Sequence, residues 1–136
     1  MNKEEMLYLA QRLMERIEER RLQRLEEAKK KRLNDFIVKE EIIVCDSNKN
    51  PVYKLKQNTK VTGIIVIASG EEIRDVQFLI EKYKLQDGTL TNAKDWQKVR
   101  GRGTVLIEGL GEQSREIHWY QCKNIGKVEF KIKERG

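Results

Sequence analysis

The hydrophobic period of the chain changes near Asn34, from helical spacing before it to extended spacing after it. Residues 2–34 contain neither Gly nor Pro and are rich in Leu, Met, Glu, Lys, Arg and Gln, which favours one long helix. Its first half carries an apolar stripe, formed by Met6, Leu9, Leu13 and Ile17. We therefore expect residues 1–35 to form a basic amphipathic helix that self-associates through this stripe.

Beyond Asn34, short segments rich in β-branched and aromatic residues alternate with turn residues, as in an antiparallel sheet. Residues 71–84 differ, because apolar residues recur there at helical spacing and Ser69 is placed to cap the helix. The expected strands are 36–45, 52–56, 61–68, 96–100, 104–108, 115–122 and 127–133. The predicted fold class is α+β: a long N-terminal helix, then a domain over 36–136 in which one helix packs on an antiparallel sheet.

The last two predicted strands separate polar from apolar side chains, because successive residues of a strand point to opposite faces. Their apolar residues, together with Val105 and Ile107, are expected to face the second helix: Ile117, Trp119, Val128, Phe130 and Ile132. The opposite face then carries the polar residues of these strands and of the strand at 96–100: Lys98, Arg100, Glu116, His118, Tyr120, Lys127, Glu129, Lys131 and Lys133.

This polar face has the groups needed to cleave RNA without a metal: a proton acceptor, a proton donor and cations for the charge that builds on the phosphate. The catalytic candidates are His118, Glu116, Glu129 and Lys131. The substrate-binding candidates are Lys98, Arg100, Tyr120, Lys127 and Lys133. A competing interpretation is structural, since the exposed face of an antiparallel sheet commonly carries Lys and Glu in cross-strand pairs.

Charge and cysteine spacing narrow the classes of partner. The chain has 28 Lys and Arg against 22 Asp and Glu, a net charge of +6, which favours an anionic partner such as nucleic acid. Cys45 and Cys122 stand far apart, without the spacing of a zinc site, so we expect no metal and no cofactor. No apolar run approaches the ~18 residues needed to span a bilayer, and the N-terminus is charged. A cytoplasmic protein without a membrane partner is expected.

Four short segments resemble the C-terminal toxin domains of bacterial polymorphic toxins, of the contact-dependent inhibition and phage-associated types. These segments are Ile73-Arg74-Asp75-Val76, Lys94-Asp95-Trp96-Gln97-Lys98-Val99, Glu116-Ile117-His118-Trp119-Tyr120-Gln121 and Gly126-Lys127-Val128-Glu129-Phe130-Lys131. The resemblance covers roughly 58–133 and excludes the long helix. The order of elements is similar to the RNase architecture shared by barnase, EndoU and the RelE toxins.

The resemblance implies a metal-independent endoribonuclease that uses His118 and neighbouring lysines, with RNA, such as tRNA, as substrate. It also implies a neutralising immunity or antitoxin protein as a partner. Because the chain starts at Met1 without a large delivery region, contact-dependent delivery and a stand-alone protein of a phage or mobile element both stay open. The alternative function is a non-catalytic module, an adaptor or inhibitor, that binds nucleic acid or protein through the same face.

Overall fold

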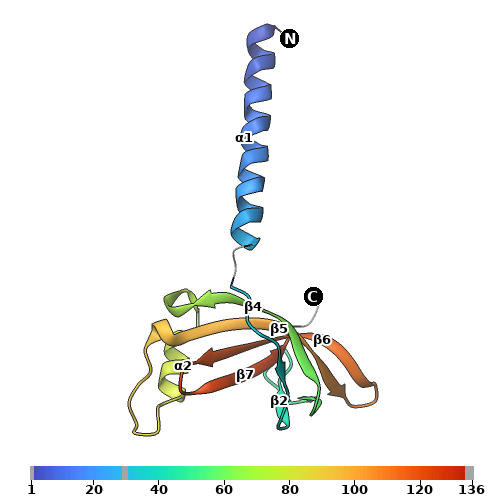
Figure 1. The fold of residues 1–136 in the computed structure, drawn as a ribbon, viewed down its shortest axis with the longest axis vertical. Helices are drawn as coiled ribbons and strands as arrows, with labels where there is room; N and C mark the ends of the chain where they lie inside the picture. The colour runs from blue at the N-terminus through green and yellow to red at the C-terminus, as the bar shows by residue number, and fades with distance from the viewer. Residues whose placement is uncertain (1, 29–30, 134–136) are drawn as a thin grey trace. The chain divides into compact units, whose positions relative to one another are not determined.

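The computed structural model describes residues 2–28 and 31–133, and the chain divides into two units, 1–30 and 31–136. The first unit is the helix α1 (Lys3–Ala28), shown in blue in Figure 1. Asn2 begins it, since its side-chain Oδ1 accepts a hydrogen bond of 2.7 Å from the backbone N–H of Glu5. The side chains of α1 from residue 3 to residue 22 are exposed, so this unit has no core of its own within those residues.

The boundary between the two units lies earlier than the sequence predicted. Lys31 and Leu33 pair with the strand β4 (Lys60–Ser69), through hydrogen bonds from Val66 N–H to Lys31 O and from Leu33 N–H to Ile64 O. The sequence predicted that the helix would run to residue 34 and that the boundary would follow residue 35. Both positions lie too late in the chain. Leu33 packs against the core of the second unit, and this burial explains why it leaves the helical stripe.

The second unit is a curled antiparallel sheet (Figure 1), in which β5 (Trp96–Ile107) pairs with other strands along both of its edges. One edge of β5 pairs with β4 and β3, and the other edge pairs with β6 along its whole length. β1 pairs with β4, β2 with β3, and β7 with β6. The strands are β1 (Phe36–Ile37), β2 (Ile42–Val44), β3 (Tyr53–Leu55), β4 (Lys60–Ser69), β5 (Trp96–Ile107), β6 (Gly111–Cys122) and β7 (Gly126–Ile132).

The sheet closes on itself at Cys45, just after β2. The Cys45 N–H donates to Phe130 O at 3.0 Å, and the Ile132 N–H donates to Cys45 O at 2.9 Å. These two bonds join β2 to β7, so the concave face of the sheet becomes an enclosed interior. Apolar side chains fill that interior, among them Val44, Leu55, Val61, Val99, Val105, Ile117, Trp119, Phe130 and Ile132.

Two predicted strands, 96–100 and 104–108, are one continuous strand, β5. The two glycines of Gly101-Arg102-Gly103, which separate the predicted strands and are typical of a turn, are buried inside the strand. A Cβ on Gly101 would lie 3.0 Å from the Trp119 ring, and a Cβ on Gly103 would lie 2.9 Å from the Ile117 side chain. The glycines therefore let the largest core side chains approach the backbone of β5.

The helix predicted at 71–84 is shorter and divided. Residues Gly70–Glu72 form the 3₁₀ turn η1, and the α-helix α2 spans Val76–Lys82. Ser69 makes no capping hydrogen bond through its side chain, so that prediction is wrong. The apolar residues of this segment are nevertheless buried as one stripe, as the spacing indicated: Ile73, Val76, Leu79 and Ile80.

The face that α2 covers is also different from the predicted one. Its stripe packs with Trp96, Cys122, Tyr120 and Val128, which lie on the convex outer face of the sheet. Trp119 and Phe130 are buried as predicted, 1% and 6% exposed, but in the closed interior. The physical reason is that the sheet curls enough to bury its concave face against itself, which leaves α2 to cover apolar residues at one end of the convex face.

A β-bulge in β7 breaks the alternation that the sequence predicted for 127–133. His118 pairs with Lys131 but Tyr120 pairs with Val128, so two residues of β7 stand opposite Trp119. Glu129 occupies the bulge with φ of 57°. Residues before the bulge therefore change face: Val128 lies with α2 on the outer face, whereas Phe130 and Ile132 lie in the interior.

Candidate active site

The outer face of the sheet brings together a row of polar residues from three neighbouring strands. His118 of β6 lies between Arg100 of β5 and Lys131 of β7. The next outward residues along the strands are Lys98 and Tyr120 on one side, and Glu116 on the other. We call this group the His118 face. It adjoins the part of the outer face that α2 covers, and Tyr120 belongs to both.

His118 and Glu116 form the centre of the His118 face. The His118 Nε2 lies 3.2 Å from Glu116 Oε2, and the two side chains are 15% and 31% exposed. A carboxylate only accepts hydrogen bonds, so a charged Glu116 places the hydrogen of neutral His118 on Nε2 and the lone pair on Nδ1. No hydrogen bond from the described residues reaches Nδ1. This nitrogen is the proton acceptor that the site offers.

Opposing effects act on the pKa of His118. Burial lowers the pKa, the hydrogen bond and charge of Glu116 raise it, and the charges of Lys133 and Lys98 lower it again. The net effect is a pKa below the ordinary value of 6.5. The imidazole is therefore mostly neutral at pH 7, the form in which it accepts a proton.

Cations and a phenol surround this pair. Arg100 Nη1 lies 3.8 Å from Glu116 Oε1, and the Arg100 side chain is 41% exposed, so its guanidinium can also contact an anion from solvent. Lys98 Nζ lies 5.9 Å from the centre of the Tyr120 ring, a cation–π contact. Burial, followed by the charges of Asp75 and Glu129, raises the pKa of Tyr120, so its hydroxyl stays a donor at neutral pH.

Lys131 and Lys133 complete the His118 face from β7. Lys131 stands directly across from His118 and is exposed. The backbone N–H of Lys133 donates to Glu116 O at 3.1 Å, which fixes the end of β7 against β6. The structure thus gathers seven of the nine candidate residues on one face: Lys98, Arg100, Glu116, His118, Tyr120, Lys131 and Lys133.

Glu129 and Lys127 are placed elsewhere, and the bulge is the cause. Glu129 Oε1 accepts hydrogen bonds of 2.6 Å from Lys82 Nζ and 2.8 Å from the Tyr83 hydroxyl, which ties β7 to α2. Burial raises the pKa of Glu129, but these two partners outweigh it and lower the pKa overall. Lys127 pairs with Gln121 on the opposite face, and its Nζ lies 4.5 Å from the centre of the Phe36 ring. Their expected position beside His118 is therefore corrected.

Arg102 is a cation of the same face that the sequence interpretation missed. It pairs with Glu116 in the register of β5 and β6, and it is exposed. Its Nη1 lies 3.4 Å from Ser114 Oγ. The Gly-Arg-Gly sequence around it is typical of a turn, so only the packing of Trp119 and Ile117 against the glycines identifies it as a strand residue.

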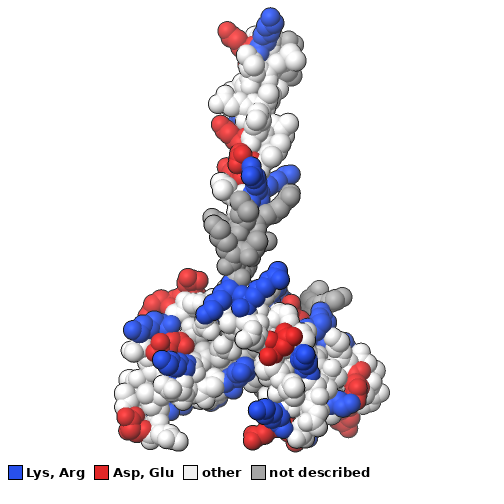
Figure 2. Space-filling view, in the orientation of Figure 1, with Lys and Arg blue, Asp and Glu red and all other residues white. Residues whose placement is uncertain are grey.

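Positive and negative side chains are mixed on the surface of the second unit that Figure 2 shows, where Lys and Arg are interspersed with Asp and Glu. In the part of the chain that the structure describes, no three His, Cys, Asp or Glu residues are grouped to hold a metal ion. Nor is any helix of residues 2–28 and 31–133 long and apolar enough to cross a membrane.

Comparison with known proteins adds no relative. No family model matches the chain, and the comparison with curated proteins and with solved structures found no match. The chemistry of the His118 face therefore has to be judged from its own residues.

Proposed function

We propose that this protein is a metal-independent endoribonuclease that acts through the His118 face. The observation that carries the proposal is the His118–Glu116 pair, flanked across two strands by Arg100 and Lys131. A largely buried imidazole with a lowered pKa, an orienting carboxylate and adjacent cations are the groups that transesterification of RNA requires.

The proposed reaction uses the ribose as nucleophile. His118 Nδ1 takes the proton of the 2′-hydroxyl, and the 2′-oxygen forms a bond to phosphorus as the bond to the 5′-oxygen breaks. Arg100 and Lys131 stabilise the negative charge on the phosphate oxygens, and the 5′-oxygen takes a proton from Lys131 or from water. The products carry a 2′,3′-cyclic phosphate and a 5′-hydroxyl.

The second candidate function is a non-catalytic module that binds nucleic acid or protein. The observation that favours it is the 15% exposure of the His118 side chain, which leaves little of the imidazole open to a substrate. An adaptor or inhibitor of a phage or mobile element needs only the cations of this face. The two functions differ in whether His118 moves a proton.

Incubation of the protein with total RNA in EDTA tests the first function. We expect fragments that end in 2′,3′-cyclic phosphate, and a loss of ~10²- to 10⁴-fold in rate for His118→Ala, the size of effect expected for proton transfer by a positioned side chain. RNA affinity should stay nearly unchanged in this variant. Wild-type protein that binds RNA and leaves it intact would refute cleavage and favour the binding module.

Partners and location follow from this function as proposals. RNA, including tRNA, is the proposed substrate, and the cytoplasm is the proposed place of action. A neutralising immunity or antitoxin protein would bind over the His118 face, because covering Arg100 and Lys131 excludes the phosphate.

Self-association through α1 is a further part of the proposal. The side chains of Met6, Leu9, Leu13 and Ile17 are exposed, from 51% to 59%, and form an apolar stripe that a second copy could cover. Leu13→Glu should lower the mass measured by light scattering. Gln11→Glu, on the other side of the helix, is the matched control and should leave the mass unchanged. An equal mass for wild type and Leu13→Glu would contradict self-association through this stripe.

A further inference from the structure

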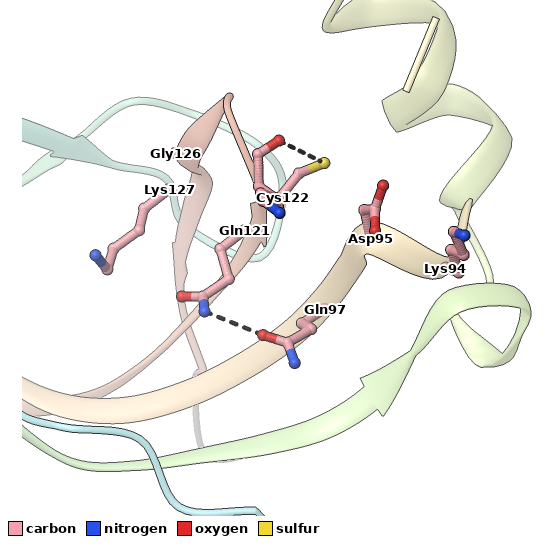
Figure 3. A pocket seen from close by; sticks show the side chains of 8 residues that line it. Lys94, Asp95, Gln97, Gln121, Cys122, Gly126 and Lys127 are labelled. Atoms are coloured by element: carbon pink, nitrogen blue, oxygen red, sulfur yellow. Dashed lines mark hydrogen bonds between the residues drawn. The ribbon is translucent and has the colours of Figure 1, made fainter. Parts of the chain in front are cut away.

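We propose that a second site, separate from the His118 face, binds a nucleotide with a keto base. The site is a hollow where β5 begins, β6 ends and β7 begins (Figure 3). Its volume is about 460 Å³, within the range of small-ligand pockets. Gln97, Gln121 and Lys127 line it, and they alternate with Lys98, Tyr120 and Val128 of the outer face. This inference goes beyond the proposed cleavage and does not depend on it.

The amides of Gln97 and Gln121 are oriented by a chain of hydrogen bonds. Trp119 Nε1 donates to Gln121 Oε1 at 3.1 Å, and Gln121 Nε2 donates to Gln97 Oε1 at 3.1 Å. An indole N–H is a donor only, so it fixes the Gln121 oxygen toward Trp119 and its nitrogen toward Gln97. Gln97 must then accept through its oxygen. Its Nε2 hydrogens have no acceptor among the described residues, and Figure 3 shows this nitrogen turned away from Gln121.

Three lysines supply charge around the same hollow. Lys94 comes from the 3₁₀ turn η2 (Ala93–Asp95), Lys123 from the turn after β6, and Lys127 from β7. The ring of Phe36 holds the Lys127 ammonium through a cation–π contact of 4.5 Å. Among the described residues of the lining, Asp95 is the single carboxylate, so cations outnumber it. The lining therefore favours an anion beside the amide donors.

A nucleotide combines the two features that this lining recognises. The phosphate matches the lysines, and the base edge matches the Nε2 hydrogens of Gln97. Uracil and guanine present carbonyl oxygens, O4 and O6, that accept such hydrogens, whereas cytosine and adenine present an amino group at the same position. The fixed polarity of the Gln97 amide thus predicts a preference for UMP and GMP over CMP and AMP.

The two indole N–H groups allow the site to be tested in the full-length protein by ¹⁵N NMR. Trp119 Nε1 is linked to Gln97 through Gln121, by two hydrogen bonds, whereas Trp96 Nε1 donates to Thr91 Oγ1 at 2.8 Å in a buried position. Titration with UMP or GMP should shift the Trp119 signal and leave the Trp96 signal in place. CMP and AMP should need about tenfold higher concentration, the factor expected for one misplaced base contact.

Gln97→Glu is the decisive variant, because it replaces the amide donor by an acceptor of the same size. It should abolish the preference for UMP and GMP, and Gln77→Glu, on the exposed side of α2, should not. Inorganic phosphate separates anion binding from base recognition. An equal response to phosphate alone, or an unchanged preference in Gln97→Glu, would overturn the proposal.

Two further experiments identify the source of the nucleotide and test whether nucleotide binding at this site is independent of RNA cleavage at the His118 face. A 2′-O-methyl oligonucleotide, which cannot be cleaved through its 2′-oxygen, should bind more tightly than UMP if the nucleotide belongs to an RNA chain. Equal affinity would assign the site to a free nucleotide. His118→Ala should retain the Trp119 response, so a failure of RNA cleavage leaves the nucleotide site standing, and a silent Trp119 signal refutes the site whether or not RNA is cleaved.

Discussion

His118 and Glu129 lie on neighbouring strands and were both assigned to one catalytic face, yet the structure uses them differently. His118 stands in the row of Arg100 and Lys131, and among the described residues its side chain is hydrogen-bonded only to Glu116. Glu129 sits in a bulge and holds Lys82 and Tyr83 of the α2 segment. A polar side chain on a strand therefore either lies on the exposed face of the sheet or bonds to a neighbouring element. The local strand register determines which of the two occurs.

Replacing each glutamate of the two regions by glutamine should separate chemistry from stability. Glu116→Gln removes the charge that raises the pKa of His118, so it should lower the cleavage rate, by less than the ~10²- to 10⁴-fold loss expected for His118→Ala. Glu129→Gln should leave the rate of the folded protein unchanged. It should lower the free energy of unfolding by about 1 kcal/mol, a typical net value for a hydrogen bond, since Lys82 is half exposed.

The pH dependence of the cleavage rate provides a second test of the role of Glu116. A base acts in its neutral form, so the rate should fall as the pH drops through the pKa of His118, which burial holds below 6.5. Without the charge of Glu116 this pKa falls further, and the acid limb of the pH–rate profile should move to lower pH in Glu116→Gln. Stopped-flow or gel assays across pH, with urea unfolding of both variants, measure these effects. Equal rate losses in the two variants would contradict the assignment.

A smaller effect distinguishes the cations of the two regions. Lys131 faces His118 and is free to contact a phosphate, whereas the charge of Lys82 is paired with Glu129. Lys131→Gln should reduce the slope of log affinity for single-stranded RNA against log salt by about 0.7, the value for one released counterion. Lys82→Gln should leave that slope unchanged. Filter binding at several salt concentrations provides the measurement, and identical slopes for wild type and Lys131→Gln would place the phosphate elsewhere.

The sequence predicted the parts of the fold that follow from alternation. In β6 the apolar Ile117 and Trp119 are buried and His118 lies on the other face, as expected. The α+β class, with its long N-terminal helix and a helix on an antiparallel sheet, is confirmed as well. These features depend on local periodicity, which the chain shows directly.

The rest of the arrangement depends on contacts between distant segments. Glu129 adopts a positive φ without the Gly or Asn that commonly indicates one, so the bulge could not be read from residue types. The curl of the sheet gave its concave face a lining from β2, β3 and β4, and this moved α2 to the convex face. The candidate site lost Lys127 and Glu129 for the first reason and gained Arg102 because the glycines beside it serve packing.

The closure at Cys45 also determines how other molecules can recognise this unit. Its two hydrogen bonds occupy backbone groups of Phe130 and Ile132 with which β7 would otherwise accept a strand from another chain. On the far edge, residues 31–33 and β1 occupy the backbone of β4 in the same way. Along these stretches strand addition is blocked, so a macromolecule that binds there has to be selected by side chains and their charges.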